Sequence, residues 1–83
     1  MLAASGAWIR AMRTLHILQA GPSSYEVRDE AGGLMGVASD ETKAVTSAMF
    51  SADLIGQQGY PVRVISEHDG RSEEIYAVRS GSR

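Results

Sequence analysis

Residues 39–58, which read SDETKAVTSAMFSADLIGQQ, decide the fold of this chain. At 100° per residue, five apolar side chains of this stretch fall on one stripe, as in a helix packed on a core: Val45, Ala48, Met49, Ala52 and Ile55. Ser39 or Asp40 can cap the start of such a helix, and Gly59 with Pro61 can end it. The pattern predicts one uninterrupted amphipathic helix.

The same helix carries a second apolar surface. Phe50 and Leu54 lie four residues apart and project from the side opposite the stripe. An aromatic ring and a leucine on the side expected to meet water indicate a second contact. The partner is either the N-terminal segment of the chain, where Trp8 would dock on Phe50 and Leu54, or another molecule.

Two strands are predicted before the helix. Residues 14–18 and 25–28 alternate between apolar and polar side chains, and the turn formers Gly21, Pro22 and Ser23 separate them. Pairing across this loop sets three pairs opposite each other: Leu15 with Val27, Ile17 with Tyr25, and His16 with Glu26. The first two pairs would give the hairpin one apolar face.

A third strand is predicted over residues 34–37, after a turn at residues 30–33. The same pairing logic places Met35 and Val37 beside Val27 and Tyr25 on the apolar face. The first three strands would then form a meander.

A second hairpin is predicted after the helix. Residues 62–66 and 73–78 flank Asp69-Gly70, a dipeptide typical of a two-residue type I′ turn. In that register Val64 faces Ile75 and Val62 faces Ala77. The reverse side would carry five side chains: Pro61, Arg63, Ile65, Tyr76 and Val78. A three-residue loop would instead move Tyr76 and Val78 to the core side, and both registers stay open.

The predicted element order is β-β-β-α-β-β. We expect an α+β fold, a two-layer sandwich with one amphipathic helix on an antiparallel sheet. Residues 13–79 would form a single domain, residues 1–12 a flexible or short helical leader, and residues 80–83 a disordered tail.

Composition narrows the classes of function. The chain has 83 residues, no cysteine and a formal net charge of −2. The missing cysteines exclude disulfides and thiolate zinc sites, so self-association is the expected source of extra stability for so small a domain. The slight acidity disfavours a nucleic-acid partner. No apolar run is long enough to span a bilayer, and no secretory signal precedes the domain, so we expect a cytoplasmic protein without a membrane partner.

No catalytic, cofactor or metal site is predicted. His16 with Glu26 is the best titrating pair, but no nucleophile is placed beside it. Glu67 and His68 point to opposite faces of a strand, so they do not converge on one ion. The glycines of residues 32–36 lack the lysine and hydroxyl of a phosphate-binding loop. The sequence therefore predicts a protein that is not an enzyme.

Several of these features together resemble a family of short bacterial proteins known only as a domain of unknown function. The features are the hairpin of residues 14–17 and 25–27, the alanine-rich helix beginning Ser39-Asp40-Glu41, and the closing turn His68-Asp69-Gly70-Arg71 with Glu74 and Tyr76. The likeness covers roughly residues 13–79. It implies a bacterial protein of the same fold, and it supplies no catalytic residue.

The leading functional hypothesis is a non-enzymatic domain that acts through protein–protein contacts and forms a homodimer or binds another protein. Its interface candidates are Phe50, Leu54, Ile65, Tyr76 and Trp8. The alternative is a nucleic-acid-binding module that uses the exposed sheet face, with Arg28, Arg63 and Tyr76 as its binding residues. No cofactor is expected for either.

Overall fold

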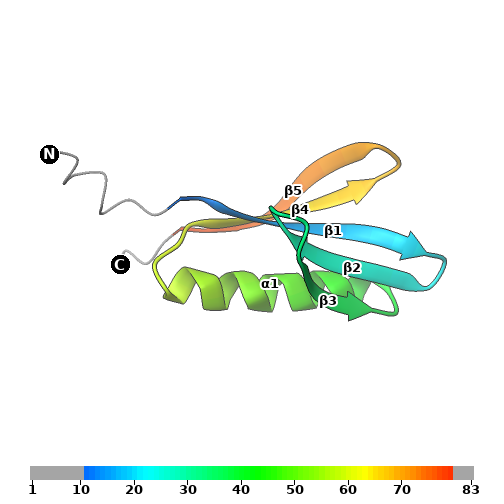
Figure 1. Ribbon diagram of the computed structural model, residues 1–83, viewed down its shortest axis with the longest axis horizontal. Helices are drawn as coiled ribbons and strands as arrows, with labels where there is room; N and C mark the ends of the chain where they lie inside the picture. Colours follow the sequence, from blue (N-terminus) through cyan, green and yellow to red (C-terminus); the bar gives the residue numbers. More distant parts are fainter. Residues whose placement is uncertain (1–10, 80–83) are drawn as a thin grey trace, which may run out of the picture.

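A computed structural model describes residues 11–79 of the chain. The elements follow one another as β1 (Arg13–Gly21), β2 (Ser24–Asp29), β3 (Leu34–Ala38), α1 (Glu41–Gln57), β4 (Val62–His68) and β5 (Arg71–Val78). Helix α1 lies along one face of the sheet, so the fold is an α+β arrangement of two layers (Figure 1). The predicted fold class and element order are confirmed. Trp8 and most of the predicted leader, together with the predicted tail, lie outside the described residues.

The five-stranded sheet has the order β3-β2-β1-β4-β5. It is mixed rather than wholly antiparallel, because β1 and β4 run parallel, with Leu15 beside Val64 and Ile17 beside Ser66. The physical reason is the connection through α1. After the β1–β2–β3 meander the helix carries the chain back to the end where β1 begins, so β4 starts at the same end as β1.

The pairing of β1 with β2 differs from the prediction by two residues. Ile17 lies opposite Val27, and His16 lies opposite Arg28 instead of Glu26. The chain turns at Pro22-Ser23, and a bulge near Gln19 then offsets the ladder. Because a shift of two preserves which face each side chain occupies, Leu15, Ile17 and Val27 still reach the core.

Strand β3 shows what a shift of one residue does. Gly36 lies opposite Val27 and Ala38 opposite Tyr25, so Met35 and Val37 do not take those places. Val37 instead lies opposite Glu26 and is 65% exposed. The prediction for β3 was wrong because an irregularity at Met35 breaks the alternation that it assumed.

The β4–β5 hairpin has the predicted two-residue turn but not the predicted register. Asp69 and Gly70 both have positive φ, of 51° and 78°, as a type I′ turn needs. A bulge at Ile75 then shifts the ladder, so that Val64 lies opposite Tyr76 and Val62 opposite Val78. Tyr76 and Val78 therefore face the helix, as in the three-residue-loop alternative, although a bulge produces the shift.

Small residues on α1 set its close approach to the sheet. The buried positions recur every four residues, at Ala44, Ala48, Ala52 and Gly56. They pack on an apolar layer from the three central strands: Leu15, Ile17, Val27, Val62 and Val64. Asp40 is the N-cap, and its side chain accepts a hydrogen bond from the Lys43 N–H. The predicted helix is confirmed, and its larger stripe residues Val45, Met49 and Ile55 are half-buried.

Candidate functional site

The exposed large apolar side chains of the described residues gather on two neighbouring elements. On β3, Leu34 is 54%, Met35 is 40% and Val37 is 65% exposed. On α1, Phe50 is 65% and Leu54 is 44% exposed. Only Met12 and Ile75 are exposed elsewhere within residues 11–79. Single exposed apolar residues are normal on proteins, but five on adjoining elements form the kind of surface that binds a partner.

Helix α1 borders β3 on the side that carries Ser47 and Leu54. A Cβ placed on Gly36 would lie 3.4 Å from Ser47 Oγ, so β3 packs beside Ser47. At 100° per residue Leu54 projects within about 20° of Ser47, whereas Phe50 projects about 60° from Ser47, directly opposite the buried ridge of the helix. We call this surface the β3–α1 flank, and it consists of Leu34, Met35, Val37, Phe50 and Leu54. It extends around the β3 edge of the sheet, because Leu34 and Val37 lie opposite Arg28 and Glu26, on the face away from α1.

The sheet face away from α1 has polar pairs along its central strands. His16 Nδ1 lies 2.6 Å from Glu67 Oε2, and Arg28 Nε donates to Glu26 Oε1 at 2.8 Å. Ile65 lies on this face, beside His16, and is half-buried. The partly apolar reverse face that the sequence predicted is therefore largely polar at its centre, and the apolar surface lies at the β3 edge instead.

Tyr76 does not belong to the reverse face of the sheet. It faces α1, and its hydroxyl donates to Asp53 Oδ1 at 2.6 Å. This hydrogen bond to the carboxylate raises the pKa of the Tyr76 phenol above its ordinary value of 10.0. The prediction of Tyr76 as an interface residue on the reverse face is wrong, because the bulge at Ile75 turns its side chain to the other side of the sheet.

The predicted nucleic-acid surface loses its aromatic residue for the same reason. Arg28 and Arg63 share the face away from α1, whereas Tyr76 lies on the helix side. Arg28 is bonded to Glu26 and also donates to the Gly32 carbonyl at 2.7 Å. Arg63 Nε contacts Thr14 Oγ1 at 3.4 Å. Within residues 11–79, two separated cations whose predicted ring, Tyr76, lies on the other face do not make a stacking platform for bases.

The histidines do not gather into a reactive cluster. The carboxylate beside His16 is Glu67, not the predicted Glu26, because β1 and β4 are parallel. His68 Nε2 pairs with Glu41 at the start of α1. Ser66, two residues away on β4, makes no hydrogen bond to His68 within residues 11–79. No group of three His, Asp or Glu residues in that part of the chain could hold a metal ion, and α1 is not long and apolar enough to cross a membrane.

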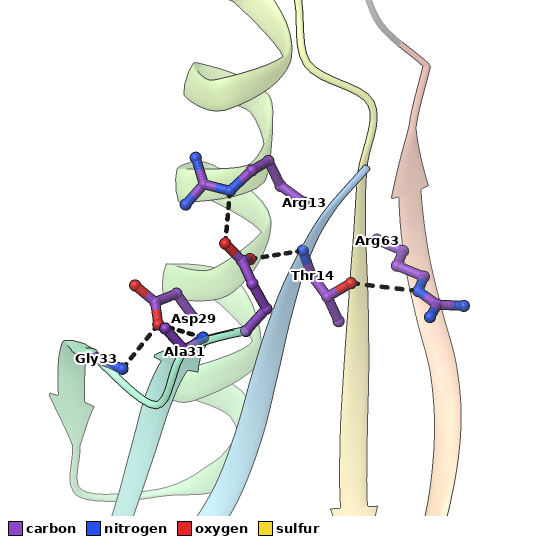
Figure 2. Close-up of polar contacts among 7 residues, drawn as sticks. Arg13, Thr14, Asp29, Ala31, Gly33 and Arg63 are labelled. Carbon is purple, nitrogen blue, oxygen red and sulfur yellow. Dashed lines mark hydrogen bonds and ion pairs between the residues drawn. The ribbon is translucent and has the colours of Figure 1, made fainter. Parts of the chain in front are cut away.

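Glu30 ties the β2–β3 turn to the start of β1, where its partners Arg13 and Thr14 lie (Figure 2). Its carboxylate accepts hydrogen bonds from the Thr14 backbone N–H at 3.1 Å and from Arg13 Nε at 3.0 Å. The Thr14 hydrogen bond, with a smaller effect of the Arg13 charge, lowers the pKa of Glu30 from its ordinary value of 4.5. Asp29 Oδ1 orders the same turn by accepting from the Ala31 and Gly33 N–H groups. The turn that leads into β3 is thus fixed at both ends.

Glu30→Gln should lower stability at neutral pH and have little effect in acid. A carboxyl whose pKa is lowered by folding adds stability above its unfolded pKa and loses it as pH falls through the folded value. The loss at pH 7 should stay below about 1 kcal/mol, because the ion pair is solvent-accessible. Urea unfolding at pH 7 and pH 3 checks this. Glu73→Gln is the control, since Glu73 has no ion pair in the described part of the chain, and an equal pH dependence for both variants would contradict the role of Glu30.

Comparison of the chain with family models, with curated proteins and with solved structures found no match. The resemblance to the bacterial family of unknown function therefore stays a prediction. The candidate site rests on the geometry alone. Sequence patterns indicated Phe50 and Leu54, but they missed the β3 residues because the alternation had placed Met35 and Val37 in the core.

Proposed function

We propose that this protein is a non-enzymatic domain that acts through protein–protein contacts and self-associates as a homodimer. The observation that carries the proposal is the β3–α1 flank, where five large apolar side chains are exposed on two adjoining elements, around the β3 edge of the sheet. A chain of 83 residues without cysteine supports it, because so small a core gains stability from association. A cytoplasmic location, with self-association in a reducing environment, is part of the proposal.

The anchor of the interface is Phe50. Large aromatic side chains near the centre of an interface contribute most of the binding free energy, because they fill a pocket from which water is excluded. Phe50 is 65% exposed and is absent from the core cluster. Its replacement should therefore weaken association without disturbing the fold.

Phe50→Asp should weaken the dimer by at least about tenfold, which corresponds to about 1.4 kcal/mol. An aspartate would lose the apolar contact and would place one negative charge from each copy at the interface. Light scattering across a concentration series measures the native mass, and circular dichroism checks the fold.

Thr42→Asp is the matched control. Thr42 is exposed in the first turn of α1 and lies away from the Phe50 side. An aspartate at this position adds the same charge to the helix as Phe50→Asp but places it outside the proposed interface. It should leave the native mass unchanged. If Phe50→Asp and wild type keep the same mass at every concentration, the proposed interface is wrong.

A further inference from the structure

The outer edge of β3 has no strand partner among residues 11–79. The sheet order places β3 at one end and β5 at the other, and β3 pairs only with β2. The N–H and C=O groups on its outer side are therefore available to another strand. These groups lie directly beside the exposed side chains of the β3–α1 flank.

The two edges of the sheet differ in how they resist pairing. Strand β5 carries Arg71, Glu73 and Glu74, and a bulge at Ile75 interrupts it. Charges and bulges are the usual means by which an edge strand avoids pairing with another chain. Strand β3 reads LMGVA, so it has neither a charge nor a proline, and its only interruption is at Met35. The edge that adjoins the exposed apolar surface is thus also the less protected one.

We infer that a second copy of this chain pairs with β3 edge to edge, in antiparallel orientation, so that the two sheets become one continuous sheet. This rests on the proposed self-association and names its geometry. A two-fold axis between the copies requires antiparallel pairing of identical strands, and an uncharged edge meets its own copy without like-charge repulsion.

The position of α1 agrees with this arrangement. In a continuous sheet both helices lie on the same face, and each turns its β3 side toward the axis. That side carries Leu54, which projects in nearly the same direction as Ser47, the residue that packs beside Gly36. Phe50 lies one turn before Leu54, on the outer surface of the helix. One axis therefore accounts for two separate observations, the open strand edge and the exposure of Leu54 on the helix. A partner that covered only the helix would leave the edge unpaired.

The absence of cysteine allows a direct test by single-cysteine cross-linking in the full chain. Three variants place a thiol at exposed positions of β3: Leu34→Cys, Met35→Cys and Val37→Cys. Opposed residues of antiparallel strands have Cβ atoms about 4.5–5.5 Å apart, close to the separation that a disulfide needs. Because a residue lies opposite its own copy only at the axis, the variants are oxidised singly and in equimolar pairs. At least one variant or pair should form a disulfide-linked dimer about tenfold faster than a thiol at the other edge, Ser72→Cys.

Light scattering of the reduced variants accompanies the cross-linking and separates the outcomes. Fast cross-linking on β3, with a dimer in the reduced state and slow cross-linking at Ser72→Cys, supports edge pairing. A dimer that cross-links no faster on β3 than at Ser72→Cys overturns edge pairing and leaves the proposed function standing. A monomer at all concentrations overturns both, and would mean that residues 1–10 or a different protein covers the flank.

Mixing two charge variants provides a second test that does not depend on thiol chemistry. Val37→Lys and Val37→Glu should each weaken self-association by about tenfold, because like charges meet across the axis. An equimolar mixture should recover the dimer mass, since the charges then complement one another. Recovery also shows that both variants are folded. If the mixture stays as weakly associated as each variant alone, the pairing of β3 with its own copy is overturned.

Discussion

Leu15→Ala should lower the free energy of unfolding by about 3 kcal/mol, the middle of the range for truncating a buried leucine. Leu15 is 0% exposed on β1, the central strand of the sheet, and the buried alanines of α1 cover its face. Rigid strands on both sides leave the cavity little room to collapse. Small domains have roughly 5–15 kcal/mol of stability in total, so the loss would be a large fraction. Urea unfolding at one fixed protein concentration measures it.

Leu18→Ala is the matched control for this substitution. Leu18 lies on the same strand but on the opposite face, is half-buried, and does not belong to the core cluster. Its truncation should remove about 1 kcal/mol or less, because little apolar area leaves a packed environment. Equal losses for the two variants would contradict the view that the core lies only between the sheet and α1.

The sequence predicts the helix and the hairpin turns well because their signals are local. Asp40 and Gly59 mark the ends of α1 through capping chemistry, and Asp69-Gly70 marks a turn through its backbone preference. The exposure of Phe50 and Leu54 follows from the 100° rotation per residue and is confirmed. None of these inferences needs to know what lies beside the segment.

The errors all concern pairing, which depends on distant parts of the chain. No local pattern reveals the bulges at Met35 and Ile75, and each of them turns the following side chains to the other face of the sheet. Val37 was predicted in the core and lies on the surface, whereas Tyr76 was predicted on the surface and faces the helix. The parallel pairing of β1 with β4 joins His16 to Glu67, a carboxylate 51 residues away that hairpin reasoning does not consider.

The irregularity at Met35 explains why only the helix residues of the candidate site could be predicted from the sequence. Its helix residues follow from periodicity, whereas its strand residues depend on the register of β3. Had the alternation held, Val37 would be in the core and β3 would expose few apolar side chains. The irregularity at Met35 therefore creates the apolar edge on which the proposed pairing depends.

Gly56→Val should lower the free energy of unfolding by about 3 kcal/mol, at the upper end of overpacking effects. Gly56 is buried near the end of α1, where the helix passes over β5. A Cβ at this position would lie 2.6 Å from Val78 Cγ1, closer than two non-bonded carbon atoms can approach without a shift of one of them. Valine is a slightly better helix former than glycine, by roughly 0.4 kcal/mol, which is too little to offset the clash. Urea unfolding again measures the loss.

The double variant with Val78→Ala separates the clash from a general effect of valine in the helix. Val78→Ala removes the methyl group that the new side chain meets, so Gly56→Val should cost much less in that background. The expected coupling is at least about 1 kcal/mol, which the four unfolding free energies of the cycle give directly. Additive losses would mean that the contact with Val78 is not the source of the destabilisation. A measurable coupling would show that the small-residue ridge of α1 sets the spacing of the two layers, which also holds Ser47 beside Gly36 on β3.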